Sequence, residues 1–343
     1  MRRVGLVLVV FGLGAACGGN SEVIDAPRPP GDGDASVPAG RFRTCTGRAY
    51  TPAATQAWRH DTQTPITLAA GSPNHAAQDQ IEPTLAVTLP GKFTYGTVSK
   101  DLEDELVRVS IDDCSAWRSL GDFATDDDGR ISVPVPSDIF TSPGVHEVRY
   151  QVLGDASTTT SFVWVLPRGT RIALTDIDGT MTQSDSELFQ QIFDGSHVPV
   201  AYPGAVDLTT THAARGHVVL YLTGRPYWLT QKTRDWVRDL SFARGPLHVT
   251  DSNGEAVPSE SGVGAFKRDY ITALLADGYV IEHAYGNAST DIYAYLGAGL
   301  PADDVWIIGS HGGEQGTHAA TDSWTARVGE VSALPAVDQP FDW

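Results

Sequence analysis

The sequence predicts an α/β domain with a doubly wound parallel sheet, preceded by an all-β sandwich domain. Between about residues 41 and 168, short runs of alternating apolar and polar residues are separated by turn residues, which is typical of a sandwich. From Arg171 onward, apolar runs of strand length alternate with helical patterns, which is typical of a parallel sheet. A chain of 343 residues is long enough for both domains.

The sandwich strands are expected where β-branched residues alternate with polar ones. Gly, Pro and Asp lie between these runs and favour turns, so an immunoglobulin-like arrangement is expected. No pattern in this region indicates chemistry, and we interpret it as a spacer or as a module that faces a membrane or a partner. The expected strands are 84–89, 106–111, 130–135 and 146–152.

The parallel sheet is expected to contain five strands with helices between them. An amphipathic segment near 188–193, a helix that opens at Pro203 and a helix over about 228–240 fill the connections. These connections have no room for a separate cap domain over the site. The expected strands are 171–175, 217–222, 246–250, 280–285 and 304–309.

Polar side chains follow three of these strands. Asp176 and Asp178 end the first, Thr223 ends the second, and Asn287 and Asp291 follow the fourth. The carboxyl ends of parallel strands form the crevice where such sheets bind ligands. Two close carboxylates repel each other unless a cation lies between them, and hard oxygen ligands favour Mg²⁺. The same D-x-D-G pattern occurs in surface turns and calcium loops, but these do not need a buried apolar lead-in.

The order of an acid pair, Thr, Lys and then Asn and Asp resembles the haloacid-dehalogenase-like phosphatases. Three stretches are similar to the catalytic domain of lipin phosphatidate phosphatases, and equally to the C-terminal domain of the retinal-degeneration-B type of membrane-associated phosphatidylinositol transfer proteins. The resemblance covers about residues 140–310. The stretches are D-I-D-G-T-M-T-Q-S-D, Y-L-T-G-R-P and Y-G-N-A-S-T-D-I-Y-A-Y-L-G-A-G-L-P.

The resemblance implies a catalytic role for the two acids. Asp176 would be the nucleophile, forming an aspartyl-phosphate, and also a Mg²⁺ ligand. Asp178 would protonate the leaving oxygen and later activate water, while its backbone carbonyl contacts the metal.

The same resemblance implies roles for the surrounding residues. Asn287 stands where many members of the superfamily have an acid, and lipin-like domains also carry Asn there. The implied phosphate-binding residues are Thr180, Thr223, Gly224 and Lys267, and the implied metal ligands are Asp176, Asp178, Asn287 and Asp291.

Several nearby residues keep two interpretations. Arg225 either binds phosphate or pairs with a neighbouring acid, and Lys267 is either a site residue or a solvated helix residue. His212, His217 and His311 have no ligand spacing and are interpreted as structural. No H-E-x-x-H, G-x-S-x-G or P-loop pattern is present, which argues against other hydrolase classes.

Charge and the N-terminus suggest where the protein acts. The chain has 24 Lys and Arg against 42 Asp and Glu, and this net charge of −18 argues against nucleic acid as a partner. Met1-Arg-Arg and the apolar run 4–16 have the pattern of an export signal, too short for an ordinary membrane span. The run ends at Cys17 in a sequence that resembles a bacterial lipoprotein processing site, although Gly14 replaces the usual Leu. We therefore expect export, lipidation of Cys17 and anchoring in the bacterial cell envelope.

The remaining two cysteines are expected to pair. Cys45 and Cys114 form a disulfide in an oxidising compartment, or else stay as two buried thiols. Residues 18–40 are rich in Gly, Pro, Asp and Ser and predict a disordered tether. The predicted division is a signal peptide at 1–17, a tether at 18–40, the sandwich at 41–168, a phosphatase-like domain at 169–310 and a tail at 311–343.

The predicted function is a Mg²⁺-dependent phosphomonoester phosphatase, acting on phosphatidate or another lipid phosphate at a membrane. The alternative is a phosphatidate-binding membrane module without turnover, and a third is a scaffold with a vestigial enzyme domain. The presence of both Asp176 and Asp178 favours the enzyme, because a pure binder needs no general acid.

Overall fold

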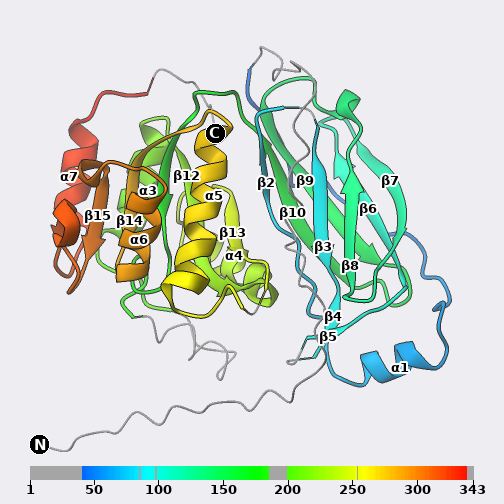
Figure 1. Ribbon diagram of the computed structural model, residues 1–343. Coiled ribbons are helices and arrows are strands. Elements are labelled where there is room, and N and C mark those ends of the chain that lie inside the picture. Colours follow the sequence, from blue (N-terminus) through cyan, green and yellow to red (C-terminus); the bar gives the residue numbers. More distant parts are fainter. Residues whose placement is uncertain (1–40, 85, 97–98, 185–198, 253, 338–343) are drawn as a thin grey trace, which may run out of the picture.

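The computed structural model describes residues 41–84, 86–96, 99–184, 199–252 and 254–337. These residues form a β-sandwich domain and an α/β domain that lie side by side (Figure 1). The predicted signal peptide, Cys17, the predicted tether and the amphipathic segment near 188–193 lie outside the described residues. No helix within the described ranges is long and apolar enough to cross a membrane.

One layer of the sandwich is a six-stranded sheet. Its order is β2-β10-β9-β6-β7, with β1 also paired to β9. The pairs β10–β9, β9–β6 and β6–β7 are antiparallel, whereas β1 and β2 pair in parallel with their neighbours. The strands are β1 (Arg43–Cys45), β2 (Gln80–Glu82), β6 (Leu106–Asp112), β7 (Trp117–Ala124), β9 (Gly144–Val152) and β10 (Thr158–Val165).

The other layer consists of two short antiparallel pairs. β3 (Thr88–Lys92) pairs with β8 (Arg130–Pro134), and β4 (Thr94–Tyr95) pairs with β5 (Lys100–Asp101). β3 begins later than the predicted strand 84–89, because its partner β8 ends at Pro134, opposite Thr88. Short helices α1 (Gln63–Leu68) and η1 (Ser137–Ile139) complete the domain. The apolar side chains of the two layers meet in one core that includes Leu89, Val107, Val133, Val148 and Val163.

The α/β domain is built on a six-stranded sheet in which every pair is parallel. Its order is β13-β12-β11-β14-β15-β16. The chain starts at the central β11, moves outward to β13, and returns to the other side of β11 for the last three strands. The strands are β11 (Arg171–Thr175), β12 (Val218–Pro226), β13 (Leu247–Thr250), β14 (Val280–Gly286), β15 (Val305–Ile308) and β16 (His318–Ala320).

Helices cover both faces of this sheet, because alternate strand residues point to opposite sides. Leu220 faces a core that includes Phe266 of α5 and Ile292 of α6. Tyr221 faces the opposite core, with Leu208 of α3, Trp236 of α4 and Trp324, the residue before α7. The helices are α3 (Ala205–Ala214), η2 (Tyr227–Leu229), α4 (Thr230–Asp239), the π-helix η3 (Glu260–Gly264), α5 (Ala265–Ala276), α6 (Ser289–Gly297), η4 (Ala302–Asp304), η5 (Glu314–Gly316) and α7 (Thr325–Ala333).

The C-terminal region belongs to the α/β domain, in contrast to the predicted tail at 311–343. β16 pairs with β15 as the sixth strand, and α7 packs against α3. Trp324 is fully buried and donates from its indole nitrogen to the carbonyl oxygen of Thr180 at 2.8 Å. A three-residue strand and a nine-residue helix are too short to give a clear periodic pattern, so only the tertiary packing identifies them.

The two domains share a hydrophobic core and a buried polar contact. Phe42, Val145 and Trp164 of the sandwich belong to the same cluster as Ile172 of the sheet. Asp79 is 2% exposed and accepts hydrogen bonds from the backbone of Phe162 in the sandwich and of Leu247 in β13. Arg234 of α4 also contacts both oxygens of Asp79, at 3.1 Å each. The domains are therefore held together by both apolar and charged contacts.

Candidate functional site

The predicted site residues gather at the carboxyl ends of β11, β12 and β14. Asp176 directly follows β11, and its backbone nitrogen donates to Tyr285 of the neighbouring β14 at 3.0 Å. Gly179 has a φ of +70°, a conformation that side chains disfavour, and it allows the chain to turn back. The hydroxyl of Thr180 thereby reaches to 3.1 Å from Oδ2 of Asp176 and 3.1 Å from Oδ1 of Asn287.

Lys267, in the first turn of α5, lies between two carboxylates. Its Nζ is 2.6 Å from Oδ1 of Asp176 and 2.7 Å from Oδ1 of Asp291, and all three residues are at least 95% buried. Burial raises the pKa of Asp176, while Lys267 opposes this shift. Burial lowers the pKa of Lys267, but its attraction to both carboxylates outweighs burial and raises that pKa overall. Lys267 is therefore a buried, ion-paired residue and not a solvated helix residue, and its phosphate-binding role stays a prediction.

Asp291 has a second structural task. Its Oδ2 accepts from the backbone nitrogens of Asn287 and Ala288 at 3.0 Å each, at the start of α6. Such a carboxylate stabilises a helix N-terminus by accepting from otherwise unpaired donors. Both oxygens of Asp291 therefore already have donors, one set from the backbone and one from Lys267.

Asp178 forms a second ion pair with Arg225. Nη2 of Arg225 lies 2.8 Å from Oδ1 of Asp178, and Nε lies 2.8 Å from Oδ2. Arg225 is fully buried, and its Nη1 also donates to Thr233 at 3.1 Å. Thr223 lies beside this pair, with its hydroxyl 3.5 Å from Oδ2 of Asp178. Of the two interpretations of Arg225, the structure supports the pairing with a neighbouring acid.

Gly224, near the end of β12, lets this strand approach the π-helix η3 closely. A Cβ atom at this position would lie 2.8 Å and 2.9 Å from the side chain of Val263. The glycine is thus needed for packing. Its predicted role in phosphate binding stays a prediction.

The charge of the site bears on the metal prediction. Asp176, Asp178 and Asp291 carry three negative charges, and Lys267 and Arg225 carry two positive ones, which leaves one negative charge. Carboxylate and amide oxygens are the ligand types that Mg²⁺ prefers, so the donor set suits this ion in kind. The fit is partial, because Lys267 lies between two of the predicted ligands and Asp291 is saturated by donors.

The structure also brings together three histidines whose spacing in the sequence indicates no common site. His283 of β14 lies beside His212 and His217, with ring centroids 4.9 Å and 5.3 Å away. Only the pairing of β14 and β12 with β11 brings His283 to the other two, and no spacing in the sequence shows this. His311 is separate from them and pairs with Glu314 at 3.0 Å.

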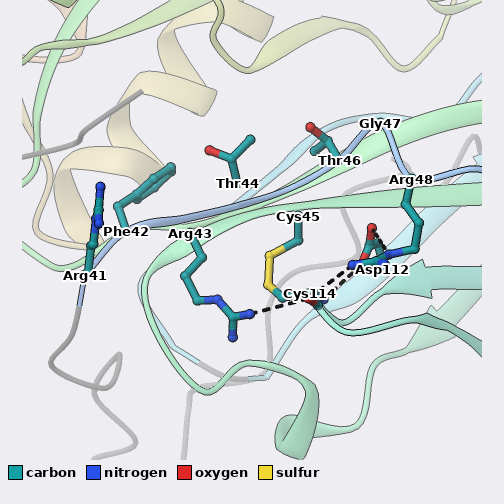
Figure 2. Close-up of a pocket in the computed structure, with 10 residues that line it drawn as sticks. All are labelled: Arg41, Phe42, Arg43, Thr44, Cys45, Thr46, Gly47, Arg48, Asp112 and Cys114. Carbon is teal, nitrogen blue, oxygen red and sulfur yellow. Dashed lines mark hydrogen bonds and ion pairs between the residues drawn. A yellow bond between two sulfur atoms is a disulfide. The ribbon is translucent and has the colours of Figure 1, made fainter.

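A hollow of about 620 Å³ lies beside β1 of the sandwich (Figure 2), and its lining includes none of Asp176, Asp178 and Asp291. The disulfide between Cys45 and Cys114 forms part of its wall, with the two Cα atoms 4.6 Å apart. Arg48 bonds Asp112 at 3.1 Å and the carbonyl oxygen of Cys114 at 3.2 Å. No sequence motif pointed to this hollow.

Family comparisons match both domains. Residues 173–309 match the model of the PITM 1-3 LNS2 domain, and residues 73–165 match the model of the PITM 1-3 β-sandwich domain. Membrane-associated phosphatidylinositol transfer protein 3 of Mus musculus is 29% identical over 253 residues, which cover 72% of this chain and 24% of the relative. Protein retinal degeneration B of Drosophila melanogaster is 28% identical over 280 residues, covering 79% and 21%. The chain thus spans a quarter or less of these relatives.

These relatives correct two predictions. They are phosphatidylinositol transfer proteins, so the predictions of a phosphatase and of hydrolase activity are wrong. The buried pair of Asp178 with Arg225 gives a physical reason, because a general acid must be free to donate a proton.

The predicted location in the bacterial cell envelope is also contradicted, since the relatives are membrane-associated proteins of mouse, rat, human and fly. Lipidation of Cys17 lies outside the described residues and stays a prediction. Residues 173–309 are therefore similar to the LNS2 domain of the PITM 1-3 proteins, and residues 73–165 are similar to the β-sandwich domain of the same proteins.

Proposed function

We propose that the LNS2 domain binds the phosphate headgroup of an anionic phospholipid such as phosphatidate without hydrolysing it. The observation that carries this proposal is the contact of Arg225 with both oxygens of Asp178. A carboxylate held by two charge-assisted hydrogen bonds is an acceptor and has no proton to give. Lys267 likewise engages Asp176, the predicted nucleophile. Both acids thus act as fixed parts of a binding site.

The charge balance supports a requirement for a divalent cation. A site with one net negative charge repels a phosphate monoester, and a bound Mg²⁺ would change that net charge to positive. Asp176 and Asn287 would hold the ion, together with the backbone carbonyl of Asp178 that the resemblance implies. The hydroxyls of Thr180 and Thr223 would then donate to the phosphate oxygens, with Lys267 adding positive charge.

We also propose that the fold is haloacid-dehalogenase-like and that the domain works at a membrane surface. The parallel strand order and the polar strand ends support the fold class. The relatives are named membrane-associated phosphatidylinositol transfer proteins, which supports a lipid ligand. An immunoglobulin-like sandwich and a lipid chain on Cys17 are parts of the same proposal, and the latter would hold the domain at the bilayer.

Vesicle binding by the full chain tests this function. Phosphatidylcholine vesicles, alone or with phosphatidate or phosphatidylinositol, are sedimented with the protein in Mg²⁺ or in EDTA, and released phosphate is assayed in parallel. We expect Mg²⁺-dependent binding to phosphatidate vesicles and no phosphate release. Equal binding to phosphatidylcholine alone, or steady release of phosphate, would contradict the proposal.

Two variants locate the binding to this site. Thr223→Val keeps the shape of the side chain but removes a donor to a charged ligand, so vesicle affinity should fall by about tenfold or more. Asp176→Asn removes charge from the cation site and should weaken the Mg²⁺ dependence. Thr272→Val is the control, since Thr272 is exposed on α5 and, among the described residues, its hydroxyl bonds only to Arg268 of the same helix. Unchanged binding by Thr223→Val and Asp176→Asn would place the lipid elsewhere.

A further inference from the structure

Three histidines lie close together, away from the strand ends that carry the acids. His212 is in the last turn of α3, His217 directly precedes β12, and His283 lies in β14. His212 and His217 are 1% and 2% exposed. The ring centroids are 5.0 Å apart for His212 and His217, 4.9 Å for His212 and His283, and 5.3 Å for His217 and His283. Each ring offers a nitrogen, and these nitrogens all lie within 4.8 Å of one another.

This triangle has the dimensions of a three-histidine metal site. Three imidazoles around a tetrahedral Zn²⁺, with Zn–N distances of about 2.0–2.1 Å, have ring centroids about 5 Å apart. The observed separations already have this size. Binding would need the three nitrogens to approach to about 3.3 Å, which small ring rotations provide.

In two of the rings, a nitrogen is available to bind a metal ion. Nδ1 of His212 and Nδ1 of His217 are buried, and among the described residues neither has a hydrogen-bond partner. Nε2 of His217 lies 3.0 Å from the carboxylate of Glu282, which can only accept, so this nitrogen carries the proton. Nδ1 of His217 therefore presents its lone pair. A carboxylate behind a histidine in this way orients metal-binding histidines in many proteins.

The rings are also in the protonation state that ligands need. Burial, together with the neighbouring rings and Arg327, lowers the pKa of His212 to about 2 and that of His283 to about 3. Burial also lowers the pKa of His217, against the pull of Glu282. Neutral imidazoles bind metal ions, whereas imidazolium does not.

We propose that His212, His217 and His283 bind Zn²⁺ or another late first-row divalent ion. Imidazole nitrogen favours these ions over Mg²⁺, which takes oxygen ligands. This site uses none of the residues of the proposed phosphate site and does not depend on that function. It would tie α3, β12 and β14 together.

Arg327 of α7 competes with the metal for His283. Its Nη2 donates to Nδ1 of His283 at 3.3 Å, and its Nε donates to the hydroxyl of Tyr285 at 3.2 Å. A neutral imidazole has one lone pair, so His283 cannot accept from Arg327 and bind a metal at the same time. Arg327 also stacks on Trp306 at 3.6 Å and pairs with Glu330, and both contacts remain available when His283 turns to the metal.

Metal binding by the full chain tests this proposal. The protein is treated with a chelator, dialysed and titrated with Zn²⁺ against a coloured competitor, and separately with Co²⁺, whose visible absorption reports tetrahedral coordination. We expect one tight Zn²⁺ that excess Mg²⁺ does not displace. His217→Gln and His283→Gln should each weaken Zn²⁺ binding at least tenfold, and Glu282→Gln about tenfold or more. Arg327→Gln should strengthen Zn²⁺ binding, because it removes the competing donor.

The controls separate this site from general binding by histidine. His311→Ala removes a partly exposed histidine that is not in the cluster, and Zn²⁺ affinity should not change. Circular dichroism and thermal unfolding show whether each variant is folded, and the Glu282 and Arg327 variants keep all three ligands in place. If wild-type protein binds no more Zn²⁺ than the His217→Gln/His283→Gln double variant, or if Co²⁺ gives no tetrahedral spectrum, the proposal is wrong.

Discussion

Two buried cations decide what the acids of the candidate site can do. Lys267 holds Asp176 and Asp291, and Arg225 holds Asp178 with two hydrogen bonds of 2.8 Å. Each carboxylate thereby has a fixed position and a fixed partner. A site of this kind is organised before its ligand arrives, which favours binding.

Removing the Arg225 side chain is expected to destabilise the fold strongly. Arg225→Met leaves the carboxylate of Asp178 largely buried without its partner, and we expect a loss of about 3 kcal/mol in the free energy of unfolding. The double variant Arg225→Met/Asp178→Asn should recover part of this loss. Urea unfolding measures both. Arg238→Met, which breaks only exposed pairs, should change stability by less than about 1 kcal/mol. Equal losses in the Arg225 and Arg238 variants would contradict this account.

At the scale of secondary structure elements, helices on both faces of the sheet hold the site residues in position. α5 carries Lys267 and packs on β13 through a stack of aromatic rings. His248 of β13 lies 3.8 Å from the ring centroid of Tyr270 and 5.4 Å from that of Phe266. On the other face, Trp324 beside α7 holds the carbonyl oxygen of Thr180. The position of each site residue therefore depends on helices that are distant in the sequence.

The stack predicts a pH dependence of stability. Burial lowers the pKa of His248 to about 3, below the usual value of 6.5. As the pH falls below 6.5, the unfolded chain binds a proton that the folded chain does not, so stability decreases over the interval from 6.5 to about 3. At pH 5 this loss should be about 2 kcal/mol. His248→Phe keeps an aromatic ring and cannot titrate. The free energy of unfolding, measured with denaturant at pH 7 and pH 5, should decrease less for the variant than for wild-type protein. Equal decreases in the two proteins would refute this role of His248.

At the scale of the whole molecule, we expect the sandwich and the sheet to unfold as one unit. They share a hydrophobic cluster, and the buried Asp79 accepts hydrogen bonds from both domains and an ion pair from Arg234. The sandwich and the α/β domain are therefore joined by both apolar and charged contacts.

Asp79→Asn should weaken this junction. The change removes the charge that pairs with Arg234 and one of the oxygens that accept, so we expect a loss of about 3 kcal/mol. Calorimetry should show a single transition for wild-type protein and a broadened or split one for the variant. Asp138→Asn is the control, because Asp138 forms an exposed pair with Arg118. A single unshifted transition for Asp79→Asn would mean that the apolar contacts alone join the domains.

The disulfide is expected to stabilise the sandwich by limiting the unfolded chain. Cys45 and Cys114 are separated by 69 residues, and closing a loop of this length contributes about 4 kcal/mol in the chain-entropy model. Titration of free thiols in denatured, unreduced protein should detect neither cysteine. Cys45→Ala/Cys114→Ala should lower the unfolding temperature, and two titrating thiols in wild-type protein would rule out the bond.

The sequence by itself determined the local features of this protein. Runs of alternating or continuous apolar residues predicted the central strands at 171–175 and 280–285, because side-chain periodicity is set by the backbone of a strand. It also predicted Asp176, Asp178 and Asn287 after strand ends, and parallel strands bring such ends to one edge; Thr223 was predicted to end its strand but lies inside β12, which continues to Pro226. The distribution of polar residues along the chain was sufficient for these inferences.

The tertiary structure decided which charges and rings meet. Arg225 pairs with Asp178 across two strands, and this contact turns a predicted general acid into a fixed acceptor. His283 reaches His212 and His217 only because β11 lies between β14 and β12. The last strand and helix are fixed by burial of Trp324, not by their own short patterns. Contacts between residues far apart in the chain depend on strand order and packing, which no local pattern specifies.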